Sequence, residues 1–587
     1  MTEHDDNLGA RLRMLYQILP AARRRQVVGT AGLMMAGALA EILSIGSLIP
    51  FLSALTRPDS LTSLPIAGPF LQRLAGDGSL VAWAASIFVI LLLVSGSLRI
   101  WLVWASQRLA FDVGHDLSVI AFSKLINQPY DYYARTNSSE LISRFEKVHI
   151  LTYSSLLAVI QALVSSVTAL LLLAFMTILS PLIALGAGTV LVTTYVLTSI
   201  LVRKRLERNS RMIGAAWSAR VETVQVALGG VRDILLDRSQ SVFEDEFRVH
   251  VGRLRKGQSI NAFISSAPKT VIETVAMIMV AVIAWRLAGQ PGGLIAAIPM
   301  LGALALAAQR LLPLLQSSYL GWSSFLGNSS LVRDVANLIA LPASPADAIK
   351  DFPPFSSELR CEHVYFAYPG QADVLHDVDF AIVRGERVGI VGSTGAGKST
   401  LMDILLGLHR PSRGRVTVDG VEMDREHRRW WQAQIAHVPQ HIFLSDDIIA
   451  RNIAFGIPAD QVDMARVRDA ARMAGIADFI ESLPDGYETM GGERGARLSG
   501  GQRQRLGIAR ALYKKATVLV LDEATSALDS ETEKGVMAAI EGLSKDITII
   551  MIAHRLDSLK RCGKILQLEG GRLTKVVESV DQLTAKS

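Results

Sequence analysis

Apolar residues are concentrated in the first half of the chain, in long runs separated by polar segments. A helix needs about 20 mostly apolar residues to cross the hydrocarbon core of a bilayer. Six stretches reach or approach this length, and we expect membrane-spanning helices at about 26–55, 80–105, 154–179, 182–202, 269–289 and 293–315. After residue 356, short β-rich runs alternate with helical patterns, which is typical of a βαβ domain. The pattern therefore predicts a membrane α-helical domain with six transmembrane helices, followed by an α/β domain.

The links between the expected spans alternate in length. Spans three and four are separated only by a turn at Ser180 and Pro181, whereas the links after spans two and four are long and polar. Basic residues cluster at 203–211 and 253–256, next to the ends of spans four and five. The positive-inside rule therefore places the long links and both termini in the cytoplasm. The long links also have helical patterns, so we expect spans two to five to extend well beyond the membrane.

The boundaries of these parts follow from local composition. Residues 11–25 are basic and amphipathic, which predicts a helix on the inner membrane surface rather than a secretory signal. Another short interfacial helix is expected at 69–76, in the first outer loop. Residues 341–356 are rich in Pro and Ala, as linkers are. The expected division is an N-terminal helix at 1–25, a membrane domain at 26–340, a linker at 341–356 and an α/β domain at 357–587.

Charge and cysteine content narrow the class of protein further. The net charge of +6 is modest for 587 residues, and we see no interleaved basic and aromatic patch, so no nucleic-acid partner is expected. Cys361 and Cys562 have no metal-ligand spacing and form no disulfide framework. Reduced thiols are therefore expected.

The most specific motif lies early in the α/β domain. Residues 392–400 read GSTGAGKST, which matches G-x-x-x-x-G-K-[ST] between a strand pattern and a helix pattern. The backbone N–H groups of such a loop, with the positive end of the following helix, bind phosphates. Lys398 is expected at the β- and γ-phosphates of ATP, and Ser399 at Mg²⁺. The expected nucleotide-binding residues are Gly392, Ser393, Thr394, Gly395, Ala396, Gly397, Lys398, Ser399 and Thr400.

A second strand pattern ends in two carboxylates. Residues 518–523 read VLVLDE, about 120 residues after the first motif. Asp522 is expected to bind the metal through water, as an acidic residue does in P-loop ATPases. Glu523 is expected to polarise the attacking water, which is the work of a general base. Together the two motifs predict an ATPase.

Between these motifs lies LSGGQ at 498–502, and with it the α/β domain resembles the ATP-binding cassette (ABC) proteins. The resemblance implies that Tyr368 stacks on adenine, that Gln440 senses Mg²⁺ and the membrane domain, and that His554 contacts the γ-phosphate. Residues 492–495 resemble the exporter-specific loop, and 526–529, which end in Asp529, resemble the D-loop.

The resemblance also implies a partner. Cassettes of this family meet head to tail, and each ATP lies between one P-loop and the partner's signature. The signature residues here are Ser499, Gly500, Gly501 and Gln502. Because the motif set is complete, we expect a homodimer with two active sites.

Six spans followed by one cassette resemble the exporter-type ABC transporters. This implies coupling helices near 128–135 and 229–237. Ionisable residues inside spans are functional candidates. Arg99, Lys269 and Arg310 are the substrate candidates, since cations at a similar depth suit an anionic head group. Snorkelling at the interface, or internal pairing with Glu41 and Glu273, is the alternative interpretation.

Four membrane segments resemble the bacterial lipid-linked oligosaccharide flippases: 40–52, 97–104, 267–274 and 308–315. In that family, arginines of the cavity are thought to meet the pyrophosphate of a polyprenyl-linked glycan. Arg99 and Arg310 match such positions, and Lys269 stands where an arginine is usual. The resemblance implies ATP-driven flipping of such a glycolipid across the bacterial inner membrane.

Other functions are weighed against this one. A multidrug, lipid A or peptide exporter is the alternative. An N-terminal peptidase domain would favour peptides as the cargo, and the sequence shows no such domain. Six spans argue against a cassette protein of translation or DNA repair. The intact Glu523 and His554 favour ATP turnover over a channel or receptor that ATP only gates.

Overall fold

The computed structural model divides the chain into two compact units. One contains residues 1–128 and 132–344, and the other contains 345–587 with the short segment 129–131. The division at 344 lies inside the expected linker. The residues that the structure describes are 13–14, 16–56, 80–179, 181–288, 293–342, 353–424, 426–492, 495, 497–523, 530–542, 546–552, 559–560 and 562–584. The expected helix at 69–76 lies outside them.

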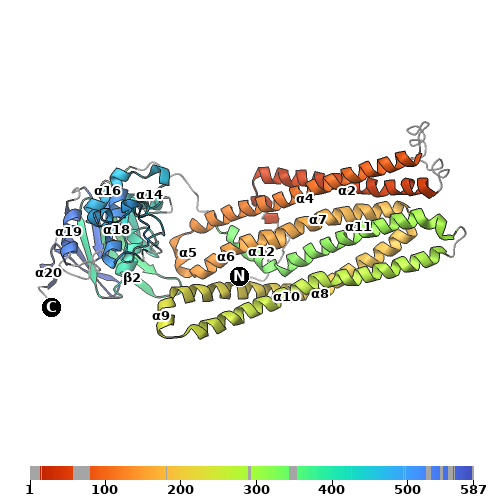
Figure 1. Cartoon of the computed structure of the whole chain (residues 1–587). Coiled ribbons are helices and arrows are strands. Elements are labelled where there is room, and N and C mark those ends of the chain that lie inside the picture. The colour runs from red at the N-terminus through yellow and green to blue at the C-terminus, as the bar shows by residue number, and fades with distance from the viewer. Residues whose placement is uncertain are drawn as a thin grey trace. The chain divides into compact units, whose positions relative to one another are not determined.

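Long helices that run side by side make up the first unit (Figure 1). They cover the six expected segments: α2 (Ala21–Thr56), α4 (Leu80–Ile126), α7 (Leu157–Leu179), α8 (Pro181–Gly229), α10 (Gln240–Ala288) and α11 (Gly293–Gly327). Shorter elements connect or follow them: α5 (Tyr130–Arg135), α6 (Ser138–Leu151), the π-helical η2 (Thr152–Leu156), α9 (Val231–Leu236) and α12 (Ser329–Ile339). The short helices α5 and α9 lie where coupling helices are expected.

Several of these helices are longer than a membrane is thick. Helices α8 and α10 have 49 residues each. At 1.5 Å per residue each spans about 70 Å, whereas the hydrocarbon core is about 30 Å thick. Over the described residues, three stretches meet both the length and the apolar composition of a membrane span: Ala21–Leu52, Val81–Ile126 and Ser138–Ile178.

The helices of this unit pack in pairs. Helix α2 packs against α4, α7 against α11, and α8 against α10. Gly321 of α11 lies so close to α7 that a Cβ atom there would be 2.3 Å from Cβ of Ala162 and 2.4 Å from the carbonyl oxygen of Ala158. Small residues at such crossings let helix backbones approach closely in membranes.

The N-terminal segment differs in one respect from the helix expected at 11–25. Helical residues at 16–18 end in a bend at Leu19, and α2 begins at Ala21, directly after Pro20. Proline disfavours a helical conformation of the residue before it but suits the first turn of a helix. The basic residues 23–25 therefore belong to α2.

The second unit contains two sheets. A four-stranded antiparallel sheet has the order β2-β1-β4-β5 and a six-stranded sheet the order β10-β9-β3-β8-β7-β6. In the larger sheet, β3, β6, β7, β8 and β9 are parallel. The strands are β1 (Glu358–Ala367), β2 (Asp373–Val383), β3 (Arg387–Gly392), β4 (Arg413–Val418), β5 (Val421–Glu422), β6 (Ile435–Val438), β7 (Val518–Asp522), β8 (Thr548–Ile552), β9 (Lys564–Glu569) and β10 (Arg572–Val577).

Central strands of the larger sheet are apolar on both faces because helices and the four-stranded sheet cover them. All five residues of β8 are buried, as are the first four of β7, and such continuous apolar runs are typical of parallel sheets. The helices of the unit are α13 (Lys398–Leu405), α14 (His427–Gln434), α15 (Ile449–Ile453), α16 (Met464–Met473), α17 (Ala477–Glu481), α18 (Gly500–Lys514), α19 (Ser530–Glu541) and α20 (Asp581–Thr584).

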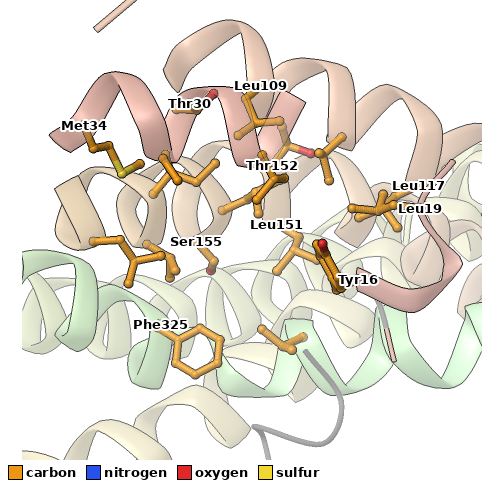
Figure 2. A pocket seen from close by; sticks show the side chains of 18 of the residues that line it. Tyr16, Leu19, Thr30, Met34, Leu109, Leu117, Leu151, Thr152, Ser155 and Phe325 are labelled. Atoms are coloured by element: carbon orange, nitrogen blue, oxygen red, sulfur yellow. The ribbon is translucent and has the colours of Figure 1, made fainter. Parts of the chain in front are cut away.

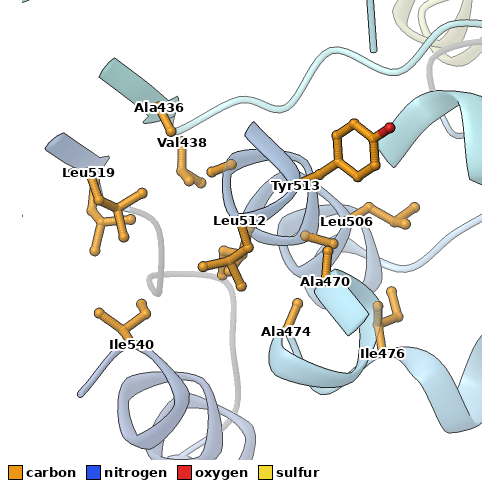
Figure 3. Packing of buried hydrophobic residues seen from close by; sticks show 14 of the residues in the cluster. Ala436, Val438, Ala470, Ala474, Ile476, Leu506, Leu512, Tyr513, Leu519 and Ile540 are labelled. Atoms are coloured by element: carbon orange, nitrogen blue, oxygen red, sulfur yellow. The ribbon is translucent and has the colours of Figure 1, made fainter. Parts of the chain in front are cut away.

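One hydrophobic cluster joins α18 to the sheet. Leu506 and Leu512 of α18 are in the same cluster as Val438 of β6, Leu519 of β7 and Ala470 of α16 (Figure 3). Because α18 packs with both the sheet and α16, its N-terminus is held in a defined place. That N-terminus is the signature expected from the sequence.

Candidate functional site: a nucleotide site and a polar membrane cavity

The P-loop connects β3 to α13. It begins at Gly392, the last residue of β3, where a Cβ atom would be 2.3 Å from the carbonyl oxygen of Leu568 on β9. It ends at Gly397, which precedes α13 with a φ of +96°. A side chain at Gly397 would also meet Leu375 at 2.8 Å. Only glycine fits both positions, so the loop keeps its backbone open to a ligand.

Lys398 lies across this loop. Its Nζ donates to the carbonyl oxygens of Gly392 at 2.8 Å and Ser393 at 3.0 Å. The residue is only 7% exposed. A buried ammonium group next to open backbone amides and the start of a helix forms a site for anions such as phosphates.

Ser399 and Thr400 follow in the first turn of α13. The hydroxyl oxygen of Tyr368 lies 3.4 Å from Oγ1 of Thr400. The ring of Tyr368 contacts the rings of Phe366 and His409 edge-on. The structure therefore brings Tyr368 to the P-loop helix. The link through Thr400 is not visible in the sequence, because the two residues come from different elements.

Asp522 and Glu523 lie at the carboxyl end of β7, with β8 between β7 and β3. Parallel neighbours end at the same edge of a sheet, so the P-loop and these carboxylates share one edge. Glu523 Oε2 accepts a hydrogen bond from Gln440 Nε2 at 2.7 Å, and the backbone oxygen of Glu523 accepts one from Gln504 Nε2 at 3.2 Å. The backbone N–H of Glu523 donates to Ile552 of β8 at 3.1 Å.

The backbone of Glu523 has a φ of +49°, in the left-handed region. Such a conformation is unfavourable for a residue with a side chain, and it persists where the surroundings over-determine it. Glu523 is held in this conformation by its hydrogen bonds with Gln440, Gln504 and Ile552. Gln504, a helical residue after the signature, is a positioning residue that our sequence analysis missed.

Negative charge accumulates at this edge of the sheet. Burial raises the pKa of Asp403 in α13, the neighbouring Asp522 carboxylate raises it further, and His409 acts in the opposite direction. Carboxylate, hydroxyl and amide oxygens are the ligands that Mg²⁺ prefers. Asp522, Ser399 and Gln440 carry these groups, and because Nε2 of Gln440 donates to Glu523, its amide oxygen is available as a ligand.

Ser499 caps the N-terminus of α18. Its Oγ accepts from the backbone N–H of Gln502 at 3.2 Å, and Gln502 Oε1 accepts from the backbone N–H of Ser499 at 2.8 Å. This capping box leaves the first backbone amides, those of Gly500 and Gly501, without helical partners. Ser499 and Gly500 are exposed, so this helix end can face an anion supplied from outside.

The signature and the P-loop are not joined within one chain. Over the part of the chain that the structure describes, no hydrogen bond or ion pair links residues 499–502 to 392–400. Asp529 and His554 lie outside the described residues, as do 493, 494, 496 and 526–528.

A second candidate site lies among the membrane helices. A cavity of about 200 Å³ lies between α2, α4, α7 and α11. Its polar lining comprises Glu41, Ser95, Arg99, Ser106, Gln161, Ser165, Thr168 and Ser317. Polar groups of this density inside a membrane domain mark a substrate or ion site by default.

Two ion pairs form among the ionisable residues of the spans whose side chains the structure describes. Arg310 Nε lies 3.8 Å from Glu41 Oε1, and Lys269 Nζ lies 3.9 Å from Glu273 Oε1. Arg99 lines the cavity and, among the described residues, has no carboxylate within 4.0 Å. The structure therefore places Arg99 and Glu41 at one cavity, and it connects Arg310, which is not a lining residue, to that cavity through its pair with Glu41. Lys269 is not among the residues that line it.

A P-loop ATPase fused to a bundle of membrane-length helices defines a class, that of the ATP-driven membrane transporters. Comparison with known proteins supports the assignment to this class. The family model "ABC transporter transmembrane region" matches residues 29–289, and "ABC transporter" matches 375–526.

Relatives and solved structures add to this. An ATP-dependent lipid A-core flippase of Chromobacterium violaceum is 32% identical over 562 residues, 91% of each chain. One of Ralstonia nicotianae is 33% identical over 476 residues, 78% of each chain. The structure of a bacterial Atm1-family ABC exporter with ATP bound matches 97% of both chains with a TM-score of 0.76 and 24% identity.

The chain belongs to the ABC transporter family, with an exporter-type membrane domain and an ATP-binding domain in one polypeptide. The expected fold class is confirmed. The protein is an ATPase coupled to transmembrane transport, embedded in the membrane by several spans. As a half-transporter it carries one P-loop and one signature, so it works as a dimer.

Proposed function

We propose that this exporter flips a glycolipid with a phosphorylated head group across the bacterial inner membrane, as a homodimer. The observation that carries the proposal is Arg99 in the polar cavity. An unpaired cation inside a membrane domain is costly unless an anion or water accompanies it. A phosphate or pyrophosphate meets a guanidinium with two parallel hydrogen bonds, which makes it the natural counterion.

The charges around the cavity support an anionic ligand. Arg99 and Arg310 contribute two positive charges and Glu41 one negative charge, so the three residues carry a net charge of +1. The Thr168 hydroxyl already donates to the carbonyl oxygen of Val164 at 2.9 Å, but the hydroxyl group of Ser165 and the amide group of Gln161 can hydrogen-bond to sugar or phosphate oxygens. An uncharged apolar drug would leave these groups unsatisfied.

Lipid A with core sugars is the first candidate cargo. The two relatives described above are lipid A-core flippases, and the similarity extends over most of each chain. Higher identities of 41–45% are also found, but over 241 to 248 residues, less than half of this chain. The similarity over most of the chain therefore supports this candidate more than the shorter stretches of higher identity do.

A polyprenyl-pyrophosphate-linked oligosaccharide is the second candidate. Two of the four segments that resemble the lipid-linked oligosaccharide flippases, 40–52 and 97–104, contain the cavity residues Glu41 and Arg99. A third segment contains Arg310, which pairs with Glu41. Both candidates share a phosphorylated glycan head and hydrocarbon tails.

The nucleotide site is proposed to be shared between two copies of the chain. ATP would contact Tyr368, the P-loop at 392–400 and the partner copy's signature at 499–502, with Asp529 and His554 completing the site. Ser399, Gln440 and Asp522 would hold Mg²⁺, which neutralises phosphate charge. Glu523 would activate the attacking water. The ATPase domain and both termini would lie in the cytoplasm, as the basic links indicate.

Reconstitution in liposomes tests the proposal. Lipid A with core sugars, a polyprenyl-pyrophosphate glycan and a neutral glycolipid are each labelled on the head group and compared with and without ATP. We expect ATP-dependent loss of one phosphorylated glycolipid from the leaflet that faces the cassettes, together with stimulated ATPase. Transport of the neutral glycolipid alone, or no response to either phosphorylated lipid, would overturn the proposal.

A further inference from the structure

A second cavity in the membrane unit is lined almost entirely by hydrocarbon. It has a volume of about 400 Å³ and lies between α2, α4, η2, α7, α11 and α12 (Figure 2). Its walls include Leu109, Val113, Leu151, Ile160, Phe325 and Val332. Protein interiors contain few voids larger than a water molecule, and an empty apolar void destabilises the fold. A cavity of this size therefore calls for an apolar occupant.

This cavity is separate from the polar cavity around Arg99. The two share no lining residue. On α7 the apolar cavity takes Ile160, Leu163 and Val167, whereas the polar cavity takes Gln161, Val164, Ser165 and Thr168. Two different faces of one helix thus line an apolar and a polar cavity.

The wall of the apolar cavity is shaped by the π-helical η2. Thr152, Ser155 and Leu156 of η2 all line it. Ser155 is 2% exposed, and its Oγ has no hydrogen-bond partner among the described residues. Gly114 of α4 packs closely against η2, since a Cβ atom at Gly114 would be 2.3 Å from Oγ1 of Thr152. Single π-helical turns occur frequently at functional sites.

The mouth of the cavity has the features of a membrane interface. Tyr16, which is 42% exposed, and Leu163, which is 57% exposed, line its accessible part. Tyrosine favours the boundary between lipid and water. Arg24 is exposed, and its Nε donates to the carbonyl oxygen of the lining residue Leu19 at 3.1 Å. A basic residue there suits an anionic phospholipid head.

We propose that this cavity holds one acyl chain of an inner-leaflet phospholipid, bound as a resident lipid and not as cargo. An apolar cavity of about 150 Å³ stays dry and holds benzene, so 400 Å³ accommodates a chain of roughly sixteen carbons. Thr30, Leu109, Val113 and Leu151 are each no more than 6% exposed. Such closely packed walls favour a lipid that stays bound through the transport cycle. The assignment of the leaflet rests on the proposed orientation.

Photo-cross-linking of the full-length protein in nanodiscs tests this inference. The probe is phosphatidylglycerol with a diazirine in the middle of one acyl chain, and adducts are located by peptide mass spectrometry. We expect adducts on the segments 109–117 and 151–160 that persist when the protein is trapped with ATP and vanadate. Ser155→Leu and Val159→Phe, which fill the cavity, should each lower these adducts roughly tenfold.

Val89→Phe is the matched control, because Val89 of α4 is 51% exposed and does not line this cavity. It should leave the adducts at 109–117 and 151–160 unchanged, and thermal unfolding of each variant in detergent shows that the membrane unit is folded. A parallel arm uses lipid A with a diazirine in one acyl chain. Labelling of the cavity by that lipid alone, loss of the phospholipid adduct on trapping, or equal labelling of both filled variants and wild type would overturn the proposal. Since the readout is a covalent adduct, these results are distinct from failure of glycolipid flipping.

Discussion

Nε2 of Gln440 donates a 2.7 Å hydrogen bond to Oε2 of Glu523. Gln440 follows β6 and Glu523 follows β7, the neighbouring strand, so the bond joins two loops at the edge of the sheet where the P-loop lies. The bond orients the carboxylate proposed as general base. It also ties that carboxylate to a loop that, in the family this chain belongs to, is expected to sense the membrane domain.

Glu523→Gln should retain ATP binding and lose turnover. The amide keeps the size of the side chain but cannot accept a proton, so we expect the turnover rate to fall about 10²- to 10⁴-fold. Nucleotide binding and phosphate release measured on the same preparation check this. Glu488→Gln, an exposed carboxylate of the same unit, is the control and should behave like wild type. Turnover close to normal in the Glu523 variant would contradict its role as the base.

Arg99→Glu and Arg310→Glu should impair transport more than basal ATPase. Either change makes the net charge of the cavity group negative, which repels a phosphorylated head group while the nucleotide site is intact. Transport and ATPase rates in proteoliposomes give the comparison. Arg205→Glu, at an exposed position that does not line the cavity, serves as the control. Losses of equal size in both activities would show that these arginines have only a structural role.

Gly321→Ala should lower the melting temperature of the membrane unit. The added methyl group would overlap Ala162 and the Ala158 carbonyl oxygen across the α7–α11 contact, and overpacking of this kind costs about 1–3 kcal/mol. Thermal unfolding in detergent measures the change. Gly96→Ala in α4 is the matched control, because a Cβ atom there meets nothing within 4 Å. Equal melting temperatures for the two variants would rule out the close crossing.

Cys361 and Cys562 should not react with thiol reagents in the native protein at pH 8. Both residues are buried, and burial raises the pKa of each thiol, that of Cys562 to about 12, so the reactive thiolate is scarce. Labelling with a maleimide before and after denaturation measures the accessible thiols. We expect none before and both afterwards. Rapid labelling of either cysteine in the folded protein would contradict the buried positions.

Much of this protein can be predicted from its sequence. Apolar runs longer than a bilayer is thick indicate membrane helices whatever their neighbours are. The P-loop is readable because its glycines, its lysine and the start of α13 are contiguous in the chain, so local backbone geometry suffices. For the same reason Ser499 and Gln502 are recognisable as the start of a helix, and the structure adds their reciprocal hydrogen bonds.

Only the tertiary structure decided which distant side chains meet. The sequence presents Glu41, Arg99 and Arg310 as separate charges on three spans, and the rotation and packing of those helices place two at one cavity and pair the third with Glu41. Strand order likewise brings Gln440 to Glu523. The π-helical η2 places Ser155 in the wall of the apolar cavity. Local patterns specify which face of an element is apolar. Which partner that face meets depends on the packing of the whole unit.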